Sequence, residues 1–287
     1  MRRKHCGTTR GTPNSRASPT VAVVPDPVPS SVRASLDDPF AALTGSLAEA
    51  RRLSFEVVGA PRISPSFVCM TLTAPELDGF RYLPGQDVML LVGADGTRPI
   101  RRRYTIRSFD PAALRLELHV VLHGDGPGER WVSAAAPGDT IEGIGPRGKI
   151  TTRPDADWHL FIGDESAMPA ILAMTESLPG DADATLLIEL PWPDDEQELL
   201  APARTRISWL HRLGGTAGEP GRLVAEAADV EIPPGRGHAY VLGEARVVSA
   251  LRGVLSERGL AQDQISPKAY WGRGRANAGH GEPARDA

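Results

Sequence analysis

The sequence predicts a two-domain protein in which an antiparallel β-barrel is followed by an α/β domain. The chain has 287 residues, which is enough for two domains of modest size. From about residue 53 to residue 150, short β-rich runs alternate with turn signals, as in antiparallel barrels and sandwiches. From about residue 158 onward, short apolar runs alternate with helical stretches, which indicates a mostly parallel sheet. We place the barrel at residues 48–152 and the α/β domain at residues 153–276.

The two ends of the chain are expected to lie outside these domains. Residues 1–47 are rich in Pro, Ser, Thr, Arg and Ala and contain almost no aromatic residue, so they cannot bury enough apolar surface to offset chain entropy. We expect a disordered extension; the Arg-rich start also fits a transit peptide or a start codon placed too far upstream. Residues 277–287 are expected to be a flexible tail.

Composition excludes several classes of protein. The net charge of −4 argues against a general nucleic-acid binder, which normally carries a basic excess. Cys6 and Cys69 are far apart, which argues against a disulfide framework and fits a reducing cytoplasm. No apolar run approaches the roughly 20 residues that a membrane-spanning helix needs. We therefore expect a cytoplasmic monomer without a resident metal or membrane insertion.

The barrel strands are identified by their β-rich composition and by the turns between them. We expect strands at residues 53–58, 67–72, 88–92, 104–106 and 114–122. Turn residues such as Pro84-Gly85 and Asp95-Gly96 separate these runs. Strict alternation of apolar and polar residues in the last run predicts one buried and one polar face.

The α/β elements follow the same kind of reasoning. We expect strands at 159–162, 185–190 and 239–242, with helices at 167–174 and about 247–255. The second helix carries one apolar stripe, and Gly259 stands where a C-terminal cap is expected. Gly163 and Gly243 each follow a strand. Ligands of parallel sheets bind at this edge, so both glycines mark a candidate site.

Residues 102–107, Arg-Arg-Tyr-Thr-Ile-Arg, combine cations, an aromatic ring and a hydroxyl on one strand. Alternation places Tyr104 and Ile106 on one face and Arg103, Thr105 and Arg107 on the other. A flavin needs a cation for its pyrophosphate, a ring against the isoalloxazine and a hydrogen bond near N5. The alternative is a basic, solvent-exposed strand face.

An ordered set of short motifs resembles the siderophore-interacting proteins, which are FAD-dependent ferric-siderophore reductases of the ferredoxin-reductase-like superfamily. The set spans roughly residues 50–275 and comprises residues 84–86, 103–107, 123–127 with Trp131, 145–148, 163–170, 209–212, 243–246 and 270–271. The resemblance implies an FAD-binding barrel and a Rossmann-like NAD(P)-binding domain. It also implies electron transfer from NADH or NADPH through FAD to Fe(III) in a ferric siderophore, with no catalytic side chain beyond the flavin.

The resemblance assigns the first group of cofactor contacts. Arg102 would meet the FAD pyrophosphate, Tyr104 would pack on the flavin, Thr105 would lie near N5, and Arg107 would be a further basic contact. The turn from His123 through Gly126 to Gly128 would approach the phosphates with backbone N–H groups. A plain tight turn, with His123 exposed or buried as an ordinary imidazole, is the alternative.

Glu129 departs from the family pattern, which has a small residue and then Ser after Gly-Pro. A glutamate that faces a pyrophosphate is repulsive. Glu129 must therefore point away, or FAD is held more weakly, or the contact is made differently.

The second group of cofactor contacts lies at the ends of the parallel strands. The resemblance assigns these positions to the nicotinamide dinucleotide: Gly163, Asp164, Glu165, Ser166, Gly243 and Glu244. The alternative is an ordinary helix start, with Ser166 as N-cap and Pro169 in the first turn. Glu189 could accept from a ribose hydroxyl, whereas Arg204 and Arg212 would favour a 2′-phosphate, so the sequence leaves NADH and NADPH open.

Basic residues near the expected flavin edge form a third group: Arg98, Arg101, Arg103, Arg147, Lys149, Lys268, Arg273 and Arg275. A cationic rim would gather anionic ferric siderophores, and we select Arg147 and Arg273 as substrate contacts. Solvated surface charge is the alternative for each. The acidic run 194–196 is expected to be a solvated loop.

The sequence leaves two further functions open. One is a flavin-dependent NAD(P)H oxidoreductase with another acceptor. The other is a siderophore-binding protein that keeps the fold without turnover.

Overall fold

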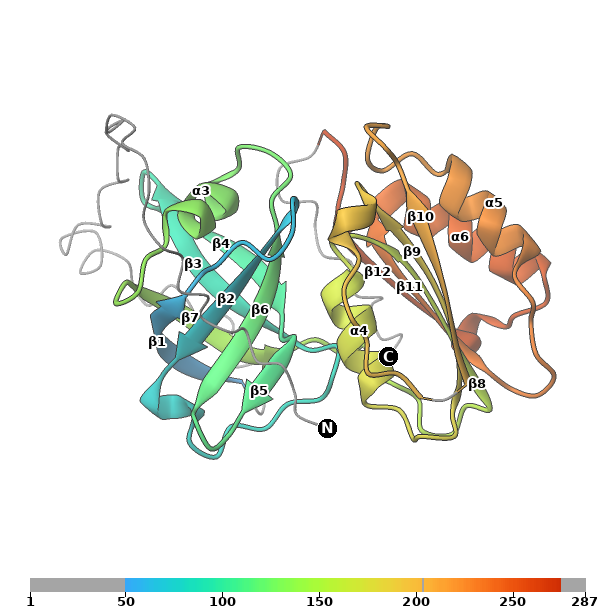
Figure 1. The fold of residues 1–287 in the computed structure, drawn as a ribbon, viewed down its shortest axis with the longest axis horizontal. Helices are drawn as coiled ribbons and strands as arrows, with labels where there is room; N and C mark the ends of the chain where they lie inside the picture. The colour runs from blue at the N-terminus through green and yellow to red at the C-terminus, as the bar shows by residue number, and fades with distance from the viewer. Residues whose placement is uncertain (1–49, 203, 275–287) are drawn as a thin grey trace.

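The structure is a computed structural model that describes residues 50–202 and 204–274. The expected N-terminal extension, the C-terminal tail and Arg275 lie outside these residues. Two β-sheets of different kinds form the two halves of the molecule (Figure 1). Within the described residues, no helix is both long enough and apolar enough to span a bilayer.

The first half is a seven-stranded antiparallel sheet in the order β4-β3-β7-β1-β2-β6-β5. Its elements are β1 (Arg51–Gly59), β2 (Phe67–Thr73), the 3-10 turn Pro75–Leu77, β3 (Asp87–Asp95), β4 (Arg98–Thr105), β5 (Ser108–Asp110), β6 (Arg115–Val121), α3 (Pro127–Ala134) and β7 (Thr140–Arg147). The sheet curls around one core, and α3 lies against β3 and β4 (Figure 1). Alternation in β6 buries Leu116, Leu118 and Val120, as predicted.

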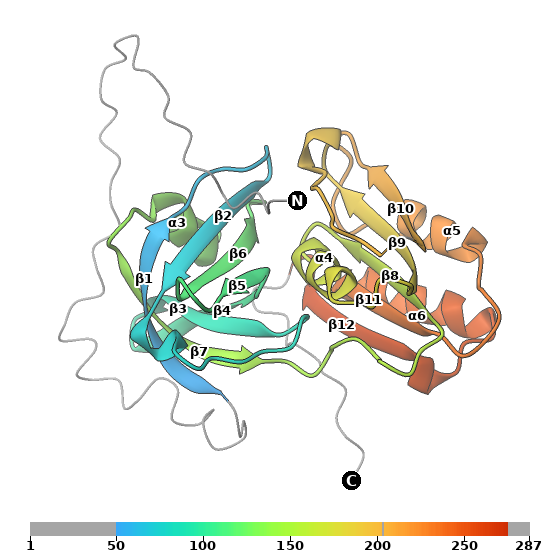
Figure 2. The ribbon, with the colours of Figure 1, turned by 60° about the horizontal axis from the view of Figure 1, so that its bottom comes forward.

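The second half is a five-stranded parallel sheet in the order β10-β9-β8-β11-β12. Its elements are β8 (Trp158–Asp164), α4 (Met168–Glu176), β9 (Asp183–Leu190), the 3-10 turn Pro193–Asp195, β10 (Arg204–His211), α5 (Gly221–Asp229), β11 (His238–Glu244), α6 (Ala245–Glu257), the 3-10 turn Gln262–Gln264 and β12 (Ile265–Trp271). Helix α4 covers one face of the sheet, and α5 and α6 cover the other (Figures 1 and 2). The predicted fold class, an antiparallel barrel followed by a Rossmann-like domain, is confirmed.

The strand order places the switch point of the second sheet between β8 and β11. The chain builds outward from β8 through β9 to β10, and then returns to add β11 and β12 on the other side. Gly163 of β8 pairs with Leu242 of β11, so Gly163 and Gly243 lie together at the carboxyl edge. This is the edge at which parallel sheets bind ligands.

Helix α4 lies between the two sheets and joins their cores (Figures 1 and 2). Phe67 and Ile150 from the barrel side belong to the same apolar cluster as Ile171 and Met174 of α4. Gly85 has φ +98°, and a Cβ there would lie 2.9 Å from Met174 Sδ. The Pro84-Gly85 turn is therefore both a backbone requirement and a contact between the domains.

The C-terminal end of α6 agrees with the sequence-based expectation, whereas the N-cap of α4 differs from it. Gly259, with φ +95°, follows α6, and the N–H of Leu260 donates to the carbonyl of Leu255 at 3.1 Å, as in a Schellman cap. Ser166 is not the N-cap of α4: Ala167 occupies that position, because the Ser166 hydroxyl donates to Asp164 instead.

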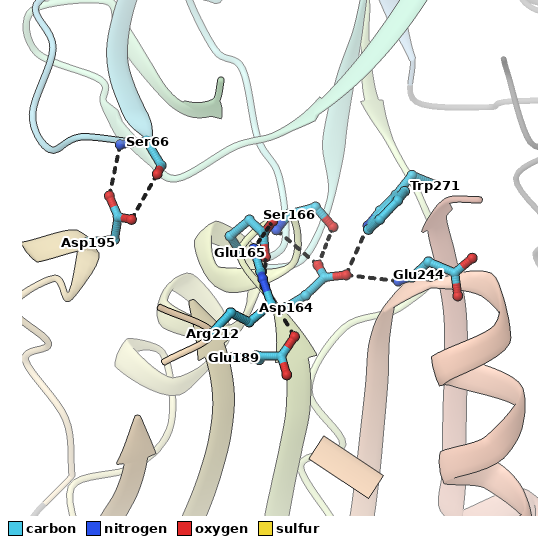
Figure 3. Close-up of polar contacts among 9 residues, drawn as sticks. All are labelled: Ser66, Asp164, Glu165, Ser166, Glu189, Asp195, Arg212, Glu244 and Trp271. Carbon is cyan, nitrogen blue, oxygen red and sulfur yellow. Dashed lines mark hydrogen bonds and ion pairs between the residues drawn. The ribbon is translucent and has the colours of Figure 1, made fainter. Parts of the chain in front are cut away.

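The acidic run 194–196 also differs from the prediction of a solvated loop. Asp195 is fully buried, and its carboxylate accepts from the N–H and hydroxyl of Ser66 at 2.8 Å each and from the hydroxyl of Ser64 at 2.7 Å. Donors from the β1–β2 turn of the barrel therefore compensate for the burial of this charge (Figure 3).

Candidate functional site

The first turn of α3 packs directly on β4 in the barrel. A Cβ on Gly128 would lie 2.7 Å from the Tyr104 hydroxyl oxygen and 2.9 Å from Arg102 Cγ. Only glycine allows this approach. The contact brings together three of the residues assigned to FAD. Burial, opposed by Arg102, raises the pKa of Tyr104, so its phenol stays protonated at physiological pH.

Glu129 folds back onto the turn that precedes α3. Its carboxylate accepts from the backbone N–H of His123 at 3.0 Å and of Gly124 at 2.6 Å. These donors belong to the turn that the family resemblance assigns to the FAD phosphates. Glu129 therefore does not point away from the phosphate region.

Arg107 lies between the two domains. Its guanidinium makes a bidentate ion pair with Glu176 at the end of α4, with both N–O distances 2.7 Å. The structure therefore places Arg107 beside the α/β domain, and its assigned contact with FAD stays a prediction. Thr105, the last residue of β4, pairs in register with Asp87 of β3.

Asp87 is a buried carboxylate that the sequence analysis missed. It accepts from Arg103 at 2.6–3.0 Å and from Lys268 Nζ of β12 at 3.2 Å. Arg103 and Lys268, which we expected in a cationic rim near the flavin edge or as solvated surface charge, are largely buried, with side chains 12% and 2% exposed. The only signal in the sequence is an acid at the start of an apolar run. Two cations therefore share one carboxylate here.

A second polar network holds the switch point of the parallel sheet (Figure 3). One oxygen of Asp164 accepts from the N–H of Glu244 and from the indole N–H of Trp271, both at 2.9 Å. The other accepts from the N–H and hydroxyl of Ser166 at 3.0 and 2.5 Å. Burial, and then the neighbouring Glu165, raise the pKa of Asp164 to about 6. Asp164 thereby joins the carboxyl ends of β8, β11 and β12.

A buried ion-pair triad lies beside this network (Figure 3). Arg212 makes two 2.7 Å hydrogen bonds to Glu165 and one of 3.2 Å to Glu189. Burial raises the pKa of Glu189, and Arg212 opposes the shift. Arg204 lies at the opposite edge of the sheet, paired with Asp183 at the start of β9. Neither arginine that we associated with a 2′-phosphate is therefore placed to receive one in this arrangement.

Trp271 connects the two halves of the site. Its ring stacks on His123 of the barrel turn, with centroids 6.3 Å apart and planes 22° apart. The turn assigned to FAD therefore meets the sheet edge assigned to the nicotinamide. Glu244, the other assigned residue here, caps α6 by accepting from the N–H groups of Arg246 and Val247.

The two residues selected as substrate contacts lie on different elements. Arg147, at the end of β7, pairs in register with Asp87 and donates to Met89 Sδ at 3.0 Å. Arg273 follows β12, donates its backbone N–H to Glu244 at 3.1 Å and forms an ion pair with Glu219. Both assignments stay predictions.

Potential metal ligands meet on β2 and β6. Atoms of Cys69, Glu117 and His119 lie within 4.8 Å of one another. His119 bonds to Gln197 across the domain interface at 2.8 Å, and Ser108 donates to Glu117 at 2.8 Å. Burial, followed by Arg107, lowers the pKa of His119 to about 4. These side chains already have protein partners, and the cluster belongs to the domain interface.

The arrangement fits a flavin at one end and not at the other. Tyr104 and Arg102 supply a ring and a cation on β4, and Gly128 lets the first turn of α3 approach both closely. At the phosphate end, the backbone donors of the turn already bind a carboxylate.

Family models of siderophore-interacting proteins match both halves of the chain. The model of the siderophore-interacting FAD-binding domain matches residues 92–150, and that of the siderophore-interacting protein matches residues 156–274. An uncharacterized protein of Mycobacterium tuberculosis is 40% identical over 210 residues, which cover 69% of this chain and 71% of that protein. The ferric vibriobactin reductase ViuB of Vibrio cholerae is 31% identical over 238 residues, covering 74% and 86%. The crystal structure of a siderophore utilization protein from T. fusca superposes with a TM-score of 0.74 at 32% identity, covering 81% of this chain and 97% of that one.

Proposed function

We propose that this chain, which belongs to the siderophore-interacting protein family, is an FAD-dependent reductase that transfers electrons from NADH or NADPH to Fe(III) in a ferric siderophore. The similarity to ViuB, a ferric vibriobactin reductase, supports the reaction class. The observation that carries the proposal is the His123–Trp271 contact, because it joins the FAD side of the barrel to the switch point of the parallel sheet.

The chemistry that bound FAD would supply is the coupling of hydride transfer from NAD(P)H, two electrons and one proton, to two single-electron reductions of Fe(III), with release of Fe(II) and the proton. The residues of the chain bind and orient. Tyr104 would pack against the flavin, Thr105 would donate near N5, and Arg102 would supply positive charge to the pyrophosphate. Asp164 holds the Trp271 indole at 2.9 Å and so positions it over the sheet edge. Electron transfer to a chelated ion needs no general acid or base, so we propose no catalytic side chain beyond the flavin.

The substrate would be recognised by charge. Two cations, Arg103 and Lys268, share Asp87, and Arg147 stands next to this group in the register of β3 and β7. A cluster of basic side chains attracts anionic ferric chelates. We propose Arg147 and Arg273 as the substrate contacts of a cytoplasmic, monomeric enzyme.

One observation favours a second candidate, a siderophore-binding protein without turnover. Glu129 binds backbone donors that a flavin phosphate would need. A chain unable to take up FAD could still carry the chelate.

Flavin uptake and reduction separate the candidates. We expect the purified full chain to bind FAD, to lose its flavin absorbance under anaerobic NADH or NADPH, and to regain it when a ferric siderophore is added, with Fe(II) captured by a colorimetric chelator. If the flavin is reduced but only a non-iron acceptor reoxidises it, the chain is a reductase for another substrate. A protein that binds no FAD but binds ferric siderophore would be the carrier.

A further inference from the structure

We propose that Glu129 is an internal competitor of the FAD phosphates: its carboxylate occupies their backbone donors and must swing away before the cofactor can seat. The inference rests on the proposed function, because it assumes that FAD binds at the barrel. Glu129 would then set the affinity of this chain for FAD.

The carboxylate of Glu129 is placed as an anion mimic. It accepts from two consecutive backbone N–H groups, those of His123 and Gly124, at 3.0 and 2.6 Å. Consecutive N–H groups that converge on one point bind phosphate oxygens as well as carboxylates. A phosphate can take these donors only if Glu129 leaves them.

Glu129 also acts on the neighbouring flavin residues. Burial is the main cause of the raised pKa of Tyr104; Arg102 lowers this pKa and Glu129 raises it, so all three side chains share one electrostatic environment. The charge of Glu129 therefore opposes the attraction that Arg102 exerts on a pyrophosphate.

Of the three candidate-site carboxylates compared here, Glu129 is the one whose surroundings allow it to leave its backbone N–H donors. Asp164 and Glu244 also accept from backbone N–H groups, but they are only 4% and 1% exposed and have several partners. Glu129 is half-buried, and its two donors are on exposed residues. Water can satisfy these donors when the side chain leaves.

The turn does not depend on Glu129 for its shape. Pro127 starts α3, Gly128 is wedged against Tyr104, and the N–H of Arg130 donates to the carbonyl of Gly126 at 2.9 Å. Loss of the carboxylate should leave these contacts in place.

The test compares FAD affinity in the flavin-free full chain, its E129Q and E129A variants, and D125N. D125N removes one charge from the same turn, but Asp125 pairs with Arg130 at 3.1 Å rather than with the backbone donors. Quenching of FAD fluorescence on titration gives the dissociation constant, and far-UV circular dichroism checks folding.

We expect E129Q and E129A to bind FAD about tenfold more tightly than the unchanged chain, and D125N to change affinity by less than about threefold. The gain should shrink in about 1 M salt, because salt screens repulsion between exposed charges.

Two results would overturn the inference while leaving FAD binding intact: E129Q and E129A binding no more tightly than the unchanged chain, or D125N gaining as much as E129Q. A failure of the unchanged chain and all variants to bind FAD would overturn the proposed function as well as the inference.

Discussion

Asp164 is a buried carboxylate whose four hydrogen-bond donors do not fully offset its loss of hydration. It is 4% exposed, and its pKa rises from 3.8 to about 6. The folded state therefore keeps a proton that the unfolded chain releases between these values. Stability falls as pH rises through this interval and is level above it.

This dependence on pH predicts that the stability profile of D164N is not parallel to that of the unchanged protein. Asparagine cannot titrate, so the stability of the variant relative to the unchanged protein should rise by about 2 kcal/mol between pH 4 and pH 7. Urea unfolding at intervals across that range measures the difference. Parallel profiles for the two proteins would show that folding does not raise the pKa of Asp164.

Tyr104 makes the most specific contribution to flavin binding among the proposed contacts. Y104A removes the aromatic face and should weaken FAD binding about tenfold or more, whereas Y104F keeps the ring and should stay within about threefold. Equilibrium dialysis with FAD gives both constants. Equal losses in the two variants would instead assign the effect to the hydroxyl, which packs against Gly128.

Residues were predictable where function depends on the local sequence and not where it depends on distant partners. Arg102, Tyr104 and Gly128 could be grouped from their motifs, and the structure brings them into contact. Asp87 could not, because the lysine that partners it is 181 residues away. Asp195 was wrongly assigned to solvent for the same reason: its donors lie about 130 residues earlier.

Elements with a clear period were predicted, and elements that break the usual signals were missed. The alternation of β6 and the apolar stripe of α6 are both confirmed. Strand β7 was not predicted, because Gly143, Gly145 and Pro146 resemble turn residues. The structure shows another reason for these glycines: a Cβ on Gly143 would lie 2.9 Å from Phe55 and Leu90, and one on Gly145 2.7 Å from Val88.

The junction between β8 and α4 also contains a glycine that close packing requires. A Cβ on Gly163 would lie 2.7 Å from Ala167 Cβ and 2.8 Å from the carbonyl oxygen of Leu242. G163A should therefore destabilise the protein by about 1–3 kcal/mol through overpacking. The matched control is G253A in α6, where nothing lies within 4 Å of the added Cβ. Helix propensity predicts that this variant gains about 0.5–1 kcal/mol. Denaturant unfolding of both variants provides the comparison, and a neutral G163A would mean that α4 can shift away from β8.

On the scale of the whole molecule, the two domains are joined by apolar packing around α4 and by ion pairs or hydrogen bonds at separate places. Arg107 pairs with Glu176, Lys268 with Asp87, and Asp195 with Ser66. Because these contacts come from the ends of several elements, they restrict rotation of one domain against the other. We infer that the domains hold the flavin edge and the switch point in a fixed relation.

Substitution of Asp195 tests whether the interface couples the two domains, because Asp195 is fully buried there while its neighbour Asp194 is exposed. D195A removes the carboxylate that accepts from the Ser66 N–H and leaves two hydroxyls to find new partners, so the free energy of unfolding should fall by about 2–4 kcal/mol. D194A removes the same charge from the surface and should change stability by less than about 0.5 kcal/mol. Thermal unfolding followed by calorimetry measures both variants.

If the interface couples the domains, the unchanged protein unfolds in one transition and D195A separates it into two. Two transitions already present in the unchanged protein would show that the domains unfold independently and that Asp195 contributes only locally.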